Sequence, residues 1–198
     1  MDLKSISLNR KLKKEIIQWS IVLAIAGTLY FTGLHTEVIG GVQSVVVRTG
    51  LIQPDTEQKN ERSPAASYDF NIITLDGTEV SFSQFKGKTI FMNLWATWCP
   101  PCVAEMPGIQ NLYEKLKKEN IVFVMISLDE NPKKPVRFIA KKQYTFPVYQ
   151  LASPLPAVFK STSIPTTFVI SPAGKVVLRH EGMADYDNEK FARFVKSL

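Results

Sequence analysis

The sequence predicts an α/β protein in which a mixed β-sheet is flanked by helices and preceded by one N-terminal transmembrane helix. In the C-terminal part of the chain, short apolar runs typical of buried strands alternate with helical patterns. This order, closed by a hairpin and a last helix, favours a helix-covered sheet. Near the N-terminus, an apolar run of about 19 residues is long enough to cross a bilayer. With 198 residues and 45% hydrophobic side chains, the chain is not wholly disordered.

The apolar run covers residues 16–34 and is predicted to be a transmembrane signal-anchor helix. Residues 1–15 before it carry five Lys or Arg against two acidic residues. This excess of basic residues predicts a cytoplasmic N-terminus and an extracytoplasmic remainder of the chain. A cleaved signal peptide is the alternative, because Ala24-Ile25-Ala26 is similar to a small-residue cleavage site. Both interpretations place the rest of the chain outside the cytoplasm.

Residues 35–67 are predicted to be a juxtamembrane segment and a linker. Valines near helical spacing in residues 37–52 fit a short amphipathic helix on the membrane surface, or an ordinary stalk. Residues 53–67 are polar and are predicted to be flexible. Half of the net charge of +6 lies in residues 1–15, and the rest is spread thinly along the chain without a basic stripe, so no nucleic-acid partner is expected.

The folded domain is predicted over residues 68–198. The dipeptide Asp76-Gly77 indicates one β-hairpin, and Pro172-Ala173-Gly174 indicates a second one. Continuous apolar runs indicate buried strands, and apolar residues at helical spacing indicate helices. The predicted strands are 68–75, 79–82, 88–95, 121–128, 147–151, 166–171 and 175–180, and the predicted helices are 101–120, 134–143 and 189–198.

Two cysteines, Cys99 and Cys102, lie between a predicted buried strand and a predicted helix. At a helix N-terminus, unpaired N–H groups and the dipole favour a thiolate, so we expect a lowered pKa at Cys99. Cys102, one turn further, is expected to be more buried and suited to resolving a mixed disulfide. The alternative is an inert pair, as a static disulfide or as two core thiols. No metal site is expected, because His35 and His180 are distant from the pair.

Two segments resemble the thioredoxin superfamily. They are Ala96-Thr97-Trp98-Cys99-Pro100-Pro101-Cys102, with Glu105-Met106-Pro107, and Ile164-Pro165-Thr166-Thr167-Phe168. The closer similarity is to the membrane-anchored, extracytoplasmic TlpA/ResA-type branch, and it covers residues 68–198. The resemblance implies a thioredoxin-like fold with an N-terminal β-hairpin extension and an inserted helix and strand. It also implies a redox-active disulfide between Cys99, as the attacking thiol, and Cys102, as the resolving thiol.

The resemblance implies further roles around the cysteines. Pro165 corresponds to a cis-proline that exposes the backbone of Ile164 to the substrate chain, and Trp98 and Pro100 are expected to contact substrate. Glu105 matches an acidic residue of this branch that can shuttle the proton of Cys102, whereas a solvent-facing glutamate is the alternative. Asn93 stands where cytosolic thioredoxins have a buried Asp. Trp95 and Phe168 line the docking surface or belong to the core.

The resemblance and the cysteine pair together predict an extracytoplasmic thiol-disulfide oxidoreductase of the bacterial inner membrane. It is expected to reduce disulfides of exported proteins, with apocytochrome c as the client that the branch suggests. Re-reduction would need a membrane electron-transfer protein, and no cofactor is expected. A disulfide-forming oxidase is the main alternative, because reduction potentials differ widely among proteins with this motif. A peroxiredoxin-like peroxidase and a copper chaperone are less well supported, since the peroxidase loop pattern and nearby histidines are missing.

Overall fold

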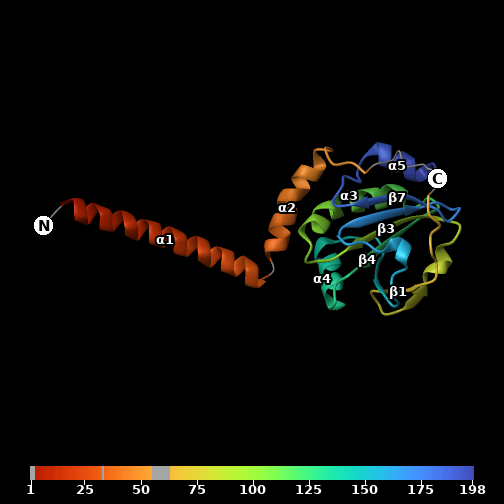
Figure 1. Ribbon diagram of the computed structural model, residues 1–198, viewed down its shortest axis with the longest axis horizontal. Helices are drawn as coiled ribbons and strands as arrows, with labels where there is room; N and C mark the ends of the chain where they lie inside the picture. The colour runs from red at the N-terminus through yellow and green to blue at the C-terminus, as the bar shows by residue number, and fades with distance from the viewer. Residues whose placement is uncertain (1–2, 33, 55–62) are drawn as a thin grey trace.

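A seven-stranded mixed sheet forms the centre of the molecule, in the order β2-β1-β5-β4-β3-β6-β7 (Figure 1). The computed structural model describes residues 3–32, 34–54 and 63–198. Strands β3, β4 and β5 run parallel, and the other neighbours are antiparallel. The strands are β1 Asn71–Thr74, β2 Glu79–Ser81, β3 Thr89–Trp95, β4 Ile121–Ser127, β5 Val148–Leu151, β6 Thr166–Ile170 and β7 Val176–Glu181. The helices are α1 Leu3–Thr32, α2 Leu34–Arg48, α3 Pro100–Leu116, α4 Lys133–Lys142 and α5 Glu189–Lys196, with 3₁₀ turns η1 Phe82–Phe85 and η2 Ala157–Phe159.

The central strand β3 is buried along its whole length because both faces of the sheet are covered. Its alternate side chains enter two separate cores. Phe91 and Trp95 pack on the face covered by α3 and α5. Ile90 and Met92 pack on the opposite face, within a cluster rich in phenylalanine. The predicted helix-covered mixed sheet and both hairpins are therefore confirmed.

Element ends differ from the prediction by a few residues. Phe82, predicted to end a strand, is buried and begins η1, whose first turn is capped by the Ser81 side chain. Helix α3 begins at Pro100 with Cys99 as its N-cap, and it ends at Leu116 rather than at residue 120. The early start of α3 places Cys99 at the N-terminus of the helix.

At the N-terminus, α1 is one 30-residue helix that projects away from the domain (Figure 1). No helical boundary separates the predicted segments 1–15 and 16–34, and residues 1, 2 and 33 lie outside the described residues. In the ranges that the structure describes, no helix is both long enough and apolar enough to cross a membrane. The predicted transmembrane helix over residues 16–34 is thus not confirmed.

Helix α2 lies against α3 (Figure 1). Val47 is buried, and Gly40 approaches the backbone of Pro100 and the side chain of Val103. The predicted linker 53–67 is only partly described, because residues 55–62 lie outside the described ranges. Its end is not free: Ala65 forms a β-bridge with Lys175 and so completes hydrogen bonding at the start of β7.

Candidate active site at the start of helix α3

The cysteine pair lies where β3 passes into α3. Cys99 and Cys102 form a disulfide with Cα atoms 5.3 Å apart. Cys99 caps the helix, and its Sγ accepts a hydrogen bond from the backbone N–H of Cys102 at 3.2 Å. Pro100 and Pro101 occupy the first helical positions, where a missing N–H costs nothing. In the reduced protein, the same N–H and the helix dipole would stabilise a thiolate on Cys99.

Exposure differs between the two sulfur-bearing residues in the direction expected. Cys99 retains 4% of its surface, whereas Cys102 has 0%. An incoming disulfide can therefore reach Cys99 first. Beside it, Trp98 is 53% exposed, so a large aromatic surface flanks the accessible cysteine. Trp95 and Phe168, in contrast, are fully buried and belong to the core.

The segment before β6 lies across from Cys99. The Ile164–Pro165 peptide bond is cis, as the resemblance implied. The carbonyl oxygen of Ile164 is 3.7 Å from Cys99 Sγ. The Ile164 backbone is thus next to the sulfur at which exchange with a client would begin.

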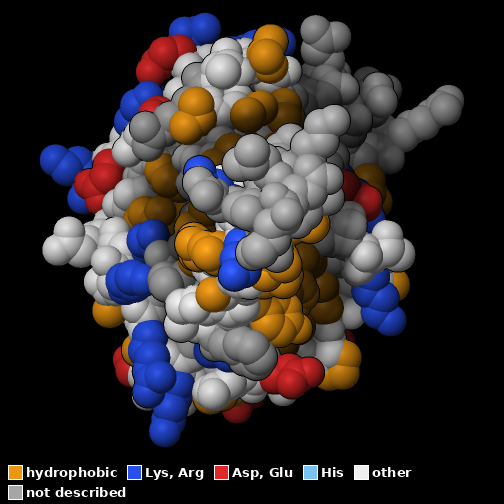
Figure 2. Space-filling view, turned by 90° about the vertical axis from the view of Figure 1, so that its left-hand side faces the viewer, with side chains coloured by type: hydrophobic (Ala, Val, Ile, Leu, Met, Phe, Trp, Pro, Cys, Tyr) orange, Lys and Arg blue, Asp and Glu red, His pale blue; other side chains and the backbone are white. Residues whose placement is uncertain are grey.

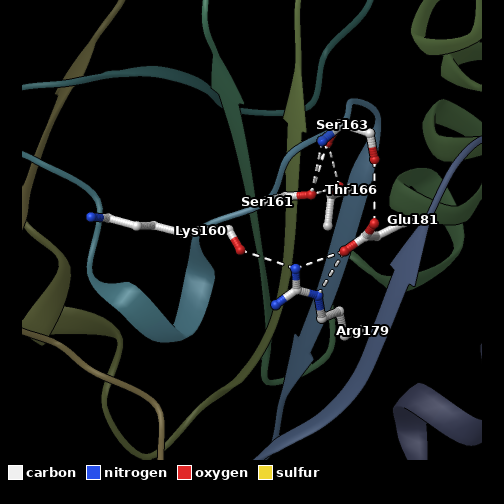
Figure 3. Close-up of polar contacts among 6 residues, drawn as sticks. All are labelled: Lys160, Ser161, Ser163, Thr166, Arg179 and Glu181. Atoms are coloured by element: carbon white, nitrogen blue, oxygen red, sulfur yellow. Dashed lines mark hydrogen bonds and ion pairs between the residues drawn. The ribbon is translucent and has the colours of Figure 1, made fainter.

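A polar network holds the loop that carries Ile164 (Figure 3). The Arg179 guanidinium donates to the carbonyl of Lys160 at 3.0 Å and to Glu181 Oε1 at 2.7 Å. The Ser163 hydroxyl donates to Glu181 Oε2 at 3.3 Å, and the Thr166 hydroxyl donates to the Ser163 carbonyl at 2.8 Å. These contacts tie both ends of the loop to β6 and β7, and no local sequence pattern indicates them.

Glu105 lies one helical turn beyond Cys102 and is completely buried. Its Oε1 accepts from Asn93 Nδ2 at 2.8 Å, and its Oε2 accepts from the Ala184 backbone N–H at 3.3 Å. Burial raises the pKa of Glu105 from 4.5 to about 8, although both hydrogen bonds act in the opposite direction. The solvent-facing alternative is wrong. A carboxyl group that titrates near neutral pH can give or take a proton at this site.

Asp129 is a site residue that the sequence did not reveal. It follows β4 and is 4% exposed. Its Oδ2 accepts from the Thr97 backbone N–H at 2.9 Å, and its Oδ1 accepts from the Thr97 hydroxyl at 2.6 Å. Asp129 therefore fixes the loop that precedes Cys99. Across residues 3–32, 34–54 and 63–198 there is no group of three His, Cys, Asp or Glu able to hold a metal ion.

Comparison with known proteins agrees with this geometry. The family model described as Redoxin matches residues 58–193. Thiol-disulfide oxidoreductase ResA of Oceanobacillus iheyensis is 29% identical over 182 residues, covering 89% of this chain and 87% of that protein. The ResA protein of Bacillus subtilis is 28% identical over 169 residues, covering 85% of each chain.

Solved structures show the same likeness. A thiol:disulfide interchange protein of the thioredoxin family from Chlorobium tepidum superposes with a TM-score of 0.60 and 30% identity, over 70% of this chain and 97% of that one. StoA from Bacillus subtilis gives a TM-score of 0.55 and 25% identity, over 66% of this chain and 98% of that one. The chain belongs to the Redoxin family, as a TlpA/ResA-like thiol-disulfide oxidoreductase of the thioredoxin superfamily.

Proposed function

We propose that this oxidoreductase reduces disulfides of exported proteins, with Cys99 as the attacking thiol and Cys102 as the resolving thiol. The observation that carries the proposal is the arrangement at the start of α3. Cys99, the more exposed cysteine, caps the helix and accepts the N–H of Cys102, whereas Cys102 is fully buried. A thiolate is the nucleophile in exchange, so the stabilised and accessible sulfur is the one that attacks.

The reaction has two exchange steps. The Cys99 thiolate bonds to one sulfur of the client disulfide, and the client's S–S bond breaks to release a thiolate. Cys102 then bonds to Cys99, which breaks the mixed disulfide and releases the second client thiolate. The client gains two electrons and the enzyme dithiol loses them. Glu105 accepts the proton that leaves the Cys102 thiol, and the released client thiolates take protons from water.

Client binding is assigned to the surface around Cys99. The Ile164 backbone lies beside Cys99 Sγ, held by the Arg179–Glu181 network. An extended client segment can pair with this backbone and pack against the exposed ring of Trp98, next to Pro100 in the first turn of α3. We propose apocytochrome c as the client class, which the resemblance to the TlpA/ResA-type branch implies.

We place the redox domain outside the cytoplasm and attach it to the bacterial inner membrane through α1. In support, α1 and α2 expose large apolar side chains, and Figure 2 has hydrophobic side chains gathered on the face from which α1 projects. The basic residues of segment 1–15 favour a cytoplasmic N-terminus. A membrane electron-transfer protein then supplies the two electrons that regenerate the dithiol.

Trapping tests the assigned roles. The Cys102→Ala variant, expressed as the full chain, should accumulate a mixed disulfide between Cys99 and its client, because the resolving thiol is missing. The matched Cys99→Ala variant should accumulate none. Trapping by Cys99→Ala alone would reverse the two roles. Fractionation of the same cells would place the trapped adduct in the membrane, or would refute the attachment through α1.

The reduction potential of the Cys99/Cys102 pair tests the direction. A low potential, nearer to that of thioredoxin, is expected for a reductase. A potential near the strongly oxidising end would instead assign disulfide formation to this protein.

A further inference from the structure

Glu105 has a buried polar partner of its own on the neighbouring strands. The amide of Asn93, in the middle of β3, donates one N–H to Glu105 Oε1 at 2.8 Å and the other to Thr167 Oγ1 at 2.9 Å. Asn93 and Thr167 lie opposite each other in the β3–β6 ladder, so their side chains are on the same face of the sheet, beneath α3. All three side chains are fully buried.

The two donated hydrogen bonds determine how the Asn93 amide is oriented. Both N–H groups are used, whereas Asn93 Oδ1 is buried and has no hydrogen-bond partner among the residues that the structure describes. Leaving an acceptor unpaired in the interior destabilises the fold, because the group has lost its hydrogen bonds to water. The sheet therefore holds the Asn93 amide with both N–H donors toward Glu105 and Thr167. In this orientation, the amide oxygen lacks a hydrogen bond.

This orientation of the Asn93 amide favours the ionised form of Glu105. An N–H donor stabilises a carboxylate more than a neutral acid, because hydrogen bonds to charged groups are the stronger ones. The shorter contact is at Oε1, and the contact of Oε2 with Ala184 N–H is longer. A proton on Glu105 is therefore best placed on Oε2, away from the amide donor.

We propose that Asn93, held in place by Thr167, is a positioning residue that orients the Glu105 carboxyl and keeps it able to ionise beside the redox cysteines. The inference rests on the proposed role of Glu105 as the acceptor of the Cys102 proton. To take that proton, Glu105 must be ionised at the moment of resolution. Without the Asn93 donor, the buried carboxyl would lose its proton only at a still higher pH, further from neutrality.

Other titratable groups surround this carboxyl and bear on any measurement. Cys99 and Cys102 belong to the same helix, Tyr186 comes from the loop before α5, and His180 lies opposite Thr167 on β7. Tyr186 is buried, and burial raises its pKa well above 10.0, so it remains neutral near neutral pH. Asp185 accepts the backbone N–H of Asp187 at 3.0 Å and thus engages its own loop.

The test is a direct titration of the Glu105 carboxyl in the full-length oxidised protein in detergent. The readout is the infrared absorption of the protonated carboxyl, assigned by its loss in Glu105→Gln. Asn93→Leu should raise the midpoint by about one to two pH units, the effect of one hydrogen bond to a charged group. Thr167→Val should raise the midpoint by less, since Asn93 loses only its hydrogen bond to Thr167 and can still donate to Glu105.

Thr166→Val is the matched control, because Thr166 is equally buried on β6 but bonds to Ser161 and Ser163 instead. It should leave the midpoint unchanged. An unchanged midpoint in Asn93→Leu would overturn the inference, and Thr167→Val provides the same test if Asn93→Leu does not fold. The proposed role of Glu105 fails separately, if Glu105→Gln resolves mixed disulfides as fast as the unmodified protein.

Discussion

Asp129 shows how a single distant residue can hold the loop that presents the nucleophile. Its carboxylate accepts the backbone N–H and the hydroxyl of Thr97, and its Oδ2 also accepts the Ser127 hydroxyl at 2.8 Å. Thr97 is two residues before Cys99. Three donors converge on one nearly buried carboxylate, so its loss leaves several groups without a partner.

We expect Asp129→Asn to destabilise the protein by about 1–3 kcal/mol, because an amide offers one acceptor oxygen where three donors need two. The reduced variant should also lose part of the enhanced alkylation rate of Cys99, since the loop before the helix is no longer fixed. Urea unfolding and alkylation kinetics measure the two effects. Asp69→Asn, at an exposed position, is the control. Equal stability of the two variants would refute a role for Asp129 in the loop.

The sequence predicts the part of the site that lies within one helix. Cys99, Cys102 and Glu105 are separated by three residues each, so helical geometry alone brings them together on α3. Asn93 and Thr167 come from β3 and β6, and Asp129 follows β4, so their contacts depend on strand order and register. A single sequence does not encode that register locally. The hydrogen bonds of Asn93 and Thr167, and the role of Asp129, were therefore not predicted.

At the scale of the element, α2 packs on α3 through its small residues and leaves most of its valines exposed. Val42 and Val45 are each 66% exposed, although their spacing marks them as an apolar stripe. The buried positions include Thr36, Gly40 and Val47. A helix can approach another closely where its side chains are small, so α3 contacts α2 at Gly40, whereas Val42 and Val45 remain exposed. Periodicity identified the helix but not the side that packs.

Two adjacent glycines allow a matched test of this contact. A Cβ on Gly40 would lie 3.0 Å from Val103 Cγ1 and 3.1 Å from the Pro100 carbonyl oxygen, whereas a Cβ on Gly41 would have nothing within 4 Å. Gly41→Ala should stabilise α2 by about 0.5–1 kcal/mol through helix propensity. Gly40→Ala should instead weaken the packing of α2 on α3. The cost of overpacking, typically about 1–3 kcal/mol, exceeds the gain in helix propensity.

Hydrogen exchange of the α2 amides measures both variants. Exchange should slow in Gly41→Ala and quicken in Gly40→Ala, and the amides at the start of α3 should follow the same order. Slower exchange in both variants would mean that α2 is not packed on α3 in solution.

At the scale of the whole molecule, the sheet and its helical layers were predictable, whereas the way in which the N-terminal segments attach to the domain was not. Alternating strand and helix patterns, two turn signals and the cysteine motif led to the correct fold class. Residues 64–66 lie on the edge of β7 and are held there by backbone hydrogen bonds. Such bonds do not depend on particular side chains, so the sequence did not indicate this position. The relation of α1 to a membrane stays a prediction.

The buried carboxyl of Glu105 makes the stability of the whole domain depend on pH. Its pKa is about 8 in the folded, oxidised protein and 4.5 as the ordinary value, which we take for the unfolded chain. Between these values the folded state keeps a proton that the unfolded state has lost. The free energy of unfolding therefore falls as pH rises through this window, by roughly 1.4 kcal/mol per pH unit from this group. Below pH 4.5 and above pH 8 this contribution is constant.

Glu105→Gln should remove this dependence, because the amide is neutral at every pH in the window and keeps the shape of the neutral acid. In urea unfolding of the oxidised full chain, the variant should gain stability relative to the unmodified protein as the pH rises from about 5 to about 8. The total gain should be on the order of 4 kcal/mol if the whole shift is expressed. Glu114→Gln is the control, since this exposed carboxyl on the same helix has a pKa lowered by its hydrogen bonds to Lys117 and Thr145 and so titrates below the window. Parallel pH profiles for Glu105→Gln and the unmodified protein would show that Glu105 has the same pKa in the folded and the unfolded chain, and would contradict a pKa raised by burial.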